Sequence, residues 1–273
     1  MTKTRKIIYT LLALFAAAIL SGGLFVGIRR YKRTHRPPRV VMLTIPTVRT
    51  TPDLVARLAQ KLDADSAQLM AVFGDSLLID SLGFNAQTLP AMFIPNSYEV
   101  FQWISPKKLI IRLKMEYDAF WTPERVAQAK KQGLTPVEVM TLASIVEQET
   151  ACNAEKPTIA GLYLNRLKKG MLLQADPTVK YAVGDFALKR VLNRHLKCDN
   201  PYNTYIYEGL PPGPICIPSL ASINAVLKPK THNYIYMCAK EDFSGTHNFA
   251  VTQAEHNVNA RKYAEALNKA GIR

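Results

Sequence analysis

The chain has 273 residues, of which 48% are hydrophobic and 21% charged, enough for one or two domains with a substantial core. Its formal net charge is +14, but residues 1–39 hold nine lysines and arginines and no acid, whereas the other 234 residues hold 26 basic and 21 acidic side chains. A nucleic-acid-binding domain carries clustered basic residues on its folded part, so this distribution argues against a nucleic-acid partner.

The first predicted element is a transmembrane helix. Residues 1–6 precede an uncharged apolar segment, Ile7–Ile28, whose 22 residues would span roughly 33 Å as a helix, enough to cross the hydrocarbon core of a bilayer. A cleaved signal peptide is the alternative, but its apolar region is usually shorter, so a retained single-pass anchor is favoured. Three basic residues precede the segment and five follow it closely, a count that taken alone would keep the C-terminal side in the cytoplasm.

A basic, proline-containing tether over 29–48 follows, and three Thr-Pro pairs then predict the starts of helices. Threonine caps a helix N-terminus with its hydroxyl, and proline at the first helical position loses no hydrogen bond. The helices predicted in this way cover 52–62, 123–131 and 136–149, and the last also has a capping box formed with its third residue, a glutamate. The first of them lies in a small helical subdomain over 49–93.

Residues 94–273 are predicted to form a mixed α+β domain. Further helices are expected over 107–121 and about 252–269, while the alternation in HNYIYMCA predicts a strand over 232–239. The proline-rich stretch LPPGPICIP (210–218) predicts a rigid turn. The fold class predicted for the chain is therefore α+β.

Four cysteines, Cys152, Cys198, Cys216 and Cys238, form no CxxC motif, and none has the spacing of metal ligands with a histidine. No metal and no cofactor is predicted. In an exported domain four cysteines allow three disulfide pairings. Buried free thiols are the alternative, which we favour.

The helix predicted over 136–149 ends with two glutamates, Glu147 and Glu149. Glu149 extends an apolar stripe that repeats every three or four residues from Val139, whereas Glu147 lies about 200° around the helix axis. An acid on such a stripe loses hydration and meets the negative end of the helix dipole, and both effects raise its pKa. An acid with a raised pKa can stay protonated near neutral pH, so Glu149 is a candidate catalytic acid. An acid that merely emerges at a frayed helix end is the alternative.

Polar and aromatic side chains gather in three later segments. They are Gln174, Asp176 and Thr178; Tyr202, Asn203, Thr204 and Tyr205; and His247 and Asn248. Aromatic and amide groups on rigid loops suit sugars, whose rings offer apolar faces for stacking and hydroxyls for hydrogen bonds. Each segment taken alone also fits a structural role, since Asp176 precedes a proline and is a typical turn former, and His247 could be a structural histidine.

The motifs IVEQET, NRLKKGMLLQADPTVKY, YNTYIYEGLPPGPI and GTHNF, in that order and after the stretch IPNSYEVFQW, resemble the YceG-like endolytic murein transglycosylases over about residues 94–267. The resemblance implies an enzyme anchored in the bacterial cytoplasmic (inner) membrane. Its N-terminus would be cytoplasmic and its catalytic domain periplasmic, against the charge count around the anchor. Peptidoglycan glycan strands would be its substrate, and peptidoglycan synthases are suggested as partners.

The resemblance also implies the reaction. Glu149 falls on the second glutamate of the family's E-x-E-T motif, the catalytic acid. The β-1,4 bond between N-acetylmuramic acid and N-acetylglucosamine would break without water, because the C6 hydroxyl of the sugar attacks its own anomeric carbon. The product would be a 1,6-anhydro end that terminates elongation of the nascent strand. Gln174, Asp176, Tyr202 and Asn203 would position that strand.

In one respect the chain departs from the family. Members carry a LysM-like module between the anchor and the catalytic region, but only about 20 residues separate Ile28 from Val48. The module is therefore expected to be absent or reduced.

Three other functions compete with this one. A hydrolase would use a second acid such as Glu147, Glu155 or Asp176 to activate water. A non-catalytic scaffold would bind glycan strands without cutting them. A pterin-pathway lyase, an older label for the family, is disfavoured by the apolar segment and by the lack of any apparent pyridoxal-phosphate signature.

Overall fold

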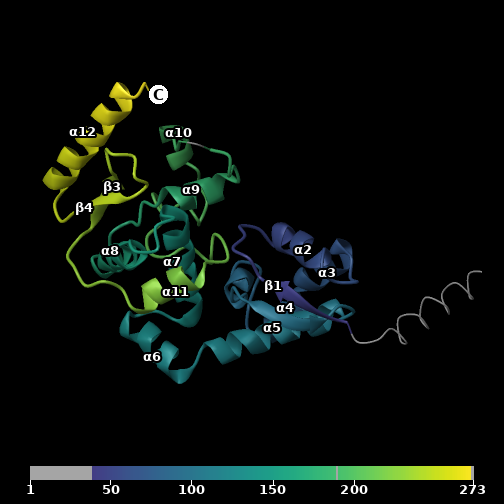
Figure 1. Cartoon of the computed structure of the whole chain (residues 1–273). Coiled ribbons are helices and arrows are strands. Elements are labelled where there is room, and N and C mark those ends of the chain that lie inside the picture. The colour runs from purple at the N-terminus through teal and green to yellow at the C-terminus, as the bar shows by residue number, and fades with distance from the viewer. Residues whose placement is uncertain (1–38, 189, 272–273) are drawn as a thin grey trace, which may run out of the picture.

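The computed structural model describes residues 39–188 and 190–271, which form two parts joined through helix α5 (Pro106–Phe120) (Figure 1). The predicted anchor over 7–28, and the predicted tether up to residue 38, lie outside the described residues. None of the helices in the described ranges combines the length and the apolar character that crossing a membrane requires.

The first part is built on a two-stranded antiparallel sheet. β1 (Val40–Thr44) pairs with β2 (Ser97–Phe101), with Val40 opposite Phe101 and Thr44 opposite Ser97. Buried and exposed residues alternate along β2, as expected for a sheet with one face against a core. The elements between the two strands are α2 (Thr51–Ala59), α3 (Ser66–Phe73), α4 (Ser76–Ser81) and the 3-10 helix η1 (Leu89–Met92).

This N-terminal unit, residues 40–101, is larger than the helical subdomain predicted for 49–93. Its first strand lies in the segment predicted as a tether, and its second strand lies past the predicted boundary at residue 94. Thr44 and Ser97 face each other across the sheet but are 53 residues apart in the chain. No local sequence pattern could therefore predict their pairing. A folded unit with its own two-stranded sheet therefore precedes α5 in the chain.

The second part surrounds α7 (Pro136–Glu149), whose residues from Val139 through Val146 are all buried. The helices of this part that contact α7 are α6 (Pro123–Lys131), α8 (Lys156–Lys168), α9 (Asp176–Val183) and α11 (Leu220–Leu227), and η1 of the first part contacts it as well. The remaining elements are the short helix α10 (Asn193–Leu196), the antiparallel hairpin of β3 (Tyr236–Ala239) and β4 (His247–Ala250), and α12 (Gln253–Lys269).

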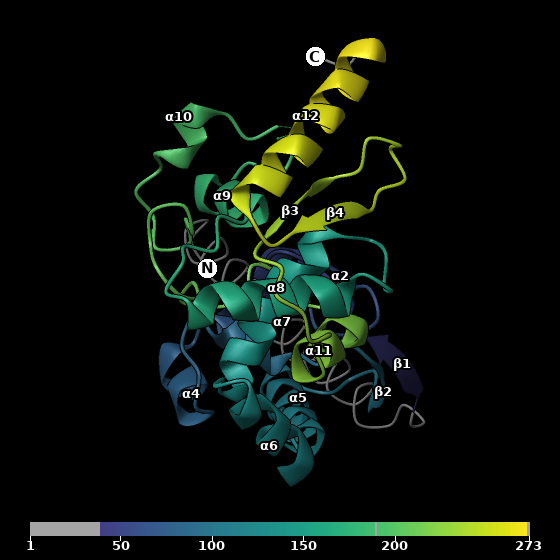
Figure 2. The ribbon, with the colours of Figure 1, turned by 90° about the vertical axis from the view of Figure 1, so that its left-hand side faces the viewer.

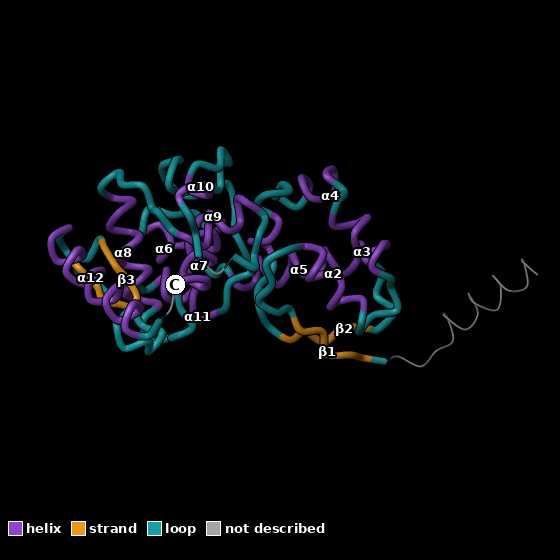
Figure 3. Tube along the Cα trace, turned by 90° about the horizontal axis from the view of Figure 1, so that it is seen from above, coloured by secondary structure: helices purple, strands orange, loops and turns teal. Residues whose placement is uncertain are grey.

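The hairpin and α12 pack together above α8, as Figure 2 shows. The two small sheets lie in different parts of the molecule (Figure 3). Helices with two small sheets confirm the mixed α+β class.

Two of the helices predicted from Thr-Pro pairs, over 123–131 and 136–149, are confirmed at both ends. The capping box of α7 is also present, since the Thr135 N–H donates to Glu138 Oε2 over 2.7 Å and the Glu138 N–H donates to Thr135 Oγ1 over 3.3 Å. The third Thr-Pro pair, Thr51-Pro52, predicted a helix over 52–62, and both of these ends are wrong for α2. Thr50 rather than Thr51 supplies the cap, and the helix ends at Ala59 instead of residue 62.

The strand predicted over 232–239 is confirmed only for 236–239. At its beginning the Tyr234 N–H donates to Nδ1 of His232 over 3.0 Å. This local bond uses a backbone donor that a sheet ladder would need, so the regular strand starts later.

The proline-rich turn predicted over 210–218 lies where the two parts meet. A Cβ atom at Gly213 would overlap the carbonyl oxygen of Gln87 in the N-terminal unit, so only glycine permits this approach. Nearby, Arg49 donates two hydrogen bonds, of 2.9 and 2.7 Å, to Oε1 of Gln148 near the end of α7. The N-terminal unit is thus held against the helix end that carries Glu147 and Glu149.

The four cysteines are free thiols, but the buried free thiols that we favoured are found at only one of the four positions. Cys216 is buried, and burial raises the pKa of its thiol to about 12. The other three are half-buried.

Candidate active site

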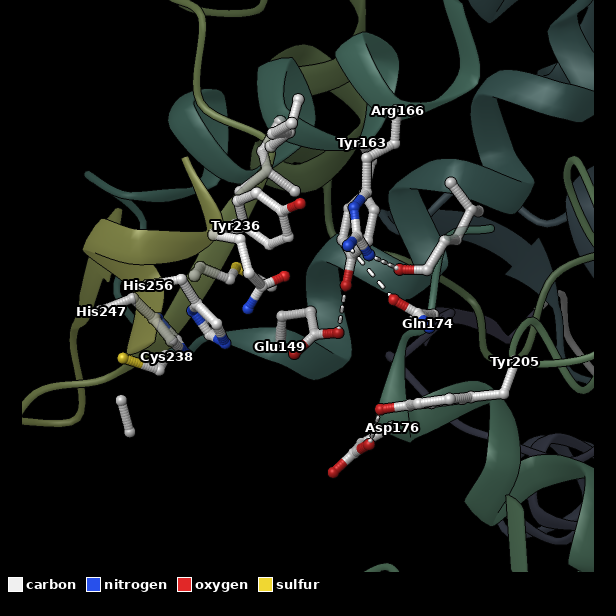
Figure 4. A pocket seen from close by; sticks show the side chains of 16 residues that line it. Glu149, Tyr163, Arg166, Gln174, Asp176, Tyr205, Tyr236, Cys238, His247 and His256 are labelled. Carbon is white, nitrogen blue, oxygen red and sulfur yellow. Dashed lines mark hydrogen bonds between the residues drawn. The ribbon is translucent and has the colours of Figure 1, made fainter. Parts of the chain in front are cut away.

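A cavity of about 450 Å³ lies where the end of α7 meets α8, the β3–β4 hairpin and the start of α12 (Figure 4). Its volume lies within the range of small-molecule sites. Five residues predicted from the sequence line it together, although they come from four separate segments of the chain. They are Glu149, Gln174, Asp176, Tyr205 and His247.

Glu149, the last residue of α7, lines this cavity (Figure 4). The hydroxyl of Tyr163 on α8 donates to its Oε1 over 2.5 Å, while Oε2 has no hydrogen-bond partner among the described residues. Burial raises the pKa of Glu149 to about 7, against the hydrogen bond from Tyr163, which lowers it; of the charged neighbours, Asp176 raises the pKa and Lys180 lowers it. Because Oε1 accepts the tyrosine hydrogen, we expect the carboxyl, when it is neutral, to carry its proton on Oε2.

The apolar stripe predicted along α7 is present but does not by itself explain Glu149. Val139 and Val146 on the stripe are fully buried, and so are Met140 and Ala143 away from it. The helix is therefore enclosed on nearly all sides. The difference between the pKa values of Glu147 and Glu149 is therefore due to the groups that surround the end of α7 and not to the stripe.

Glu147 has the opposite environment to Glu149. Its Oε2 accepts hydrogen bonds from Lys156 over 2.9 Å, from Ser222 over 2.5 Å and from the hydroxyl of Ser219. Burial alone would raise the pKa of Glu147, but the hydrogen bonds from Ser219, Ser222 and Lys156 outweigh it, and the pKa is lowered. Glu147 is thus an ionised carboxylate that ties α7 to α8 and α11.

On one side of Glu149, the cavity is lined by a group of hydrogen-bonded residues (Figure 4). The Tyr205 hydroxyl donates to Oδ1 of Asp176 over 2.6 Å, and the buried Arg166 donates to Oε1 of Gln174 over 3.3 Å. Gln174 has a φ of +51°, which non-glycine residues seldom adopt and which is found disproportionately at functional sites.

On the other side, the cavity is lined by residues of the hairpin and of α12 (Figure 4). The backbone N–H of His247 donates to Oε1 of Glu155 over 2.8 Å, and its Nδ1 lies 3.2 Å from the other oxygen of that carboxylate. The ring of His256 stacks on Tyr236 at 5.4 Å between centroids. Burial, and then the charge of Arg166, lowers the pKa of His256.

The other five predicted residues do not line this cavity. Thr178 and Thr204 are buried and share a hydrogen bond of 2.8 Å between their hydroxyls. The amide of Asn203 donates to two backbone carbonyls of the loop before it. Tyr202 packs on the ring of a neighbouring tyrosine, and Asn248 donates to a glutamate of the hairpin turn. These side chains hold the loops that carry the lining residues.

Sequence reasoning missed several lining residues: Tyr163, Arg166, Tyr236, Cys238 and His256. Tyr163 and Arg166 lie three residues apart on one face of α8, and an arginine on a mostly apolar helix was a signal that could have been used. The other three come from elements whose position over α7 no local pattern indicates.

A second hollow, of about 510 Å³, also includes Glu149. Its other walls include Glu147, Gln148, Asn153 and Lys156. Across the described ranges, no three histidine, cysteine, aspartate or glutamate side chains are grouped closely enough to hold a metal ion.

The chain is similar to a known protein family and to several of its members. The model of the YceG-like family matches residues 22–262. An endolytic murein transglycosylase of Bacillus subtilis (strain 168) is 34% identical over 203 residues, which cover 74% of this chain and 56% of the relative. Another, of Streptococcus pneumoniae serotype 2 (strain D39 / NCTC 7466), is 29% identical over 182 residues, which cover 65% of this chain and 33% of the relative. The matched region is thus about half of the first relative and a third of the second.

The fold is also similar to a solved structure. The crystal structure of the yceG-like protein lmo1499 of Listeria monocytogenes superposes with a TM-score of 0.68 at 28% sequence identity. The superposition covers 80% of this chain and 75% of the other.

Proposed function

Because the chain belongs to the YceG-like family, we propose that it is a lytic transglycosylase that cleaves the glycan strands of peptidoglycan. Relatives with the name endolytic murein transglycosylase support the proposal. The observation that carries it is the carboxyl of Glu149, whose pKa is raised to about 7 at the wall of a 450 Å³ cavity. A general acid is most effective when its pKa lies near the working pH.

In the proposed reaction Glu149 acts twice. Its Oε2 first donates a proton to the glycosidic oxygen between N-acetylmuramic acid and N-acetylglucosamine, and the bond from that oxygen to the muramic anomeric carbon breaks. The C6 hydroxyl of the same muramic acid then bonds to the anomeric carbon and gives its proton to the Glu149 carboxylate. The products are a 1,6-anhydro-muramic end and a free N-acetylglucosamine hydroxyl, and the acid is regenerated without water.

This chemistry needs one carboxyl group where ordinary glycosidases use two. Of the two glutamates on α7, Glu147 is held ionised by Lys156 and two serines, which suits a structural role and not proton donation. The burial of Glu149 and its free Oε2 suit the acid.

The remaining predicted residues take two roles in this proposal. Gln174, Asp176, Tyr205 and His247 contact the strand, since their side chains line the cavity with Glu149. Thr178, Tyr202, Asn203, Thr204 and Asn248 position the loops that carry them.

Cleavage inside a strand requires sugars to be held on both sides of the bond. Glu149 lines both the 450 Å³ cavity and the 510 Å³ hollow, so there is room for sugars on two sides of the acid. This arrangement supports an endolytic cut.

The proposal includes a location. The apolar segment Ile7–Ile28 would anchor the chain in the inner membrane with the catalytic part in the periplasm, where it would terminate nascent strands beside peptidoglycan synthases. This orientation can be tested with a reporter enzyme fused to the C-terminus of the chain. We expect the fused reporter to be active on the periplasmic side of the membrane. Activity confined to the cytoplasm would contradict this orientation.

Hydrolysis is the second candidate function, because Asp176 is an acid that lines the same cavity as Glu149. Mass spectrometry of digested strands separates the two, since a 1,6-anhydro end is lighter than a reducing end by one water. We expect anhydro ends from the wild type and no cleavage by Glu149→Gln. Reducing ends would indicate hydrolysis, and intact strands after incubation with the wild type would leave only a binding role.

A further inference from the structure

A third cavity, of about 480 Å³, lies on the opposite face of α8 from Glu149. The residues of α8 that line it fall on the far side of the helix from Tyr163 and Arg166, given 3.6 residues per turn. We call it the lysine cavity after its main lining residues, Lys131, Lys168, Lys228, Lys230, Gln132 and His232.

The lysine cavity is lined by positively charged side chains without any acidic one. Four lysines line it and no acid does, and none of the four forms an ion pair within the described part of the chain. All four lysines are exposed, so water and salt screen most of their mutual repulsion, and an anion bound in the hollow would offset the rest.

Helix dipoles compensate only part of this charge. Lys131 and Lys168 are the last residues of α6 and α8, and Lys228 caps the end of α11. A helix C-terminus carries about −0.5 elementary charge, so three of them supply about −1.5 against the four lysines. The helix ends therefore offset only part of the positive charge of the four lysines.

The loop that carries Lys230 is fixed in place. Its backbone N–H donates to the Pro157 carbonyl over 3.0 Å, and Nε2 of His232 bonds to the Thr158 carbonyl over 2.9 Å. A Cβ atom at Gly161 would lie only 2.5 Å from the Lys230 carbonyl oxygen, so glycine lets the loop lie directly on α8. The backbone wall on this side of the hollow is therefore fixed, and the exposed lysine side chains lie around it.

We infer that the lysine cavity binds a small ligand that carries two or more carboxylate or phosphate groups. Its volume is that of a small-molecule site, and ammonium groups bind both kinds of anion. The inference does not depend on the chemistry of Glu149, because the two cavities are separated by α8.

The test is isothermal titration calorimetry of the full chain with pyrophosphate and, separately, with citrate at low ionic strength. We expect saturable binding of at least one probe, weakened by added salt, and the tighter probe identifies the preferred anion. Lys168→Gln combined with Lys230→Gln should weaken binding at least about tenfold, since two lost charge pairs exceed the free energy of a tenfold change. Both lysines are exposed, so the double substitution should leave the fold intact.

The matched control is Lys107→Gln combined with Lys108→Gln, which removes the same charge from an exposed part of α5. It should bind the probes as the wild type does, and so should Glu149→Gln. Absence of saturable binding of both probes, or an equal loss of affinity in the control, would overturn the inference. Neither of these results would bear on cleavage of glycan strands, so the anion site and the proposed function can be refuted independently of each other.

Discussion

Replacing Tyr163 by phenylalanine removes the hydroxyl that donates to Glu149 and keeps the buried ring. A hydrogen bond to a charged group contributes about 1.5 to 3 kcal/mol, and one pKa unit corresponds to about 1.4 kcal/mol. The neutral carboxyl also accepts this bond, so the lower end of the range applies. The pKa of Glu149 should therefore rise by about one from its value of about 7.

The assay is the release of anhydro-ended products as a function of pH. An acid with a higher pKa stays protonated to higher pH, so the alkaline limb of the kcat profile should move upward by about one pH unit in Tyr163→Phe. Tyr98→Phe is the matched control, because it also removes a buried tyrosine hydrogen bond, of 2.8 Å, but in the N-terminal unit. An alkaline limb that stays in place in Tyr163→Phe would refute the role given to this hydrogen bond.

Three further substitutions have expected outcomes. The pKa of Glu149 lies above its ordinary 4.5, so the stability of the wild type should fall as the pH rises from 4.5 to about 7. Glu149→Gln should therefore be more stable than the wild type at pH 8, by up to about 3 kcal/mol, but not at pH 4. A stability difference in denaturant unfolding that does not change with pH would contradict this. Glu147→Ala leaves the buried Lys156 unpaired and should lower the free energy of unfolding by about 3 to 5 kcal/mol. Glu116→Ala breaks an exposed ion pair and should lower it by less than about 1 kcal/mol. Equal losses of stability in the two variants would count against a stabilising role of the buried pair. Gly213→Ala should loosen the N-terminal unit and speed limited proteolysis between the two parts, and an unchanged digestion pattern would disprove the close approach.

Much of the local structure was predictable because its causes lie within a few residues of each other. The Thr-Pro caps at 122–123 and 135–136 and the capping box of α7 predicted two helices to the residue. The wrong start predicted for α2 also has a local cause. Thr50 and Thr51 both offer a capping hydroxyl, and the sequence does not indicate which of them is used.

The pairing of β1 with β2 could not be predicted, because its partners are 53 residues apart or more and each strand is too short to show a clear period. The same limit applies to the cavity. Its missed residues, such as Tyr163 and His256, line the cavity with Glu149 only after α8 has packed on α7 and α12 on the β3–β4 hairpin.

The sequence by itself determined that two carboxyl groups, Glu147 and Glu149, close a buried helix, since helix periodicity and capping are properties of neighbouring residues. Only the tertiary structure decided that one of them is ionised and the other has a pKa of about 7. Lys156 and the serines that lower the pKa of Glu147, and the enclosure that raises that of Glu149, come from other helices and loops. A pKa depends on distances and burial in space, and these are established only when the distant segments pack together.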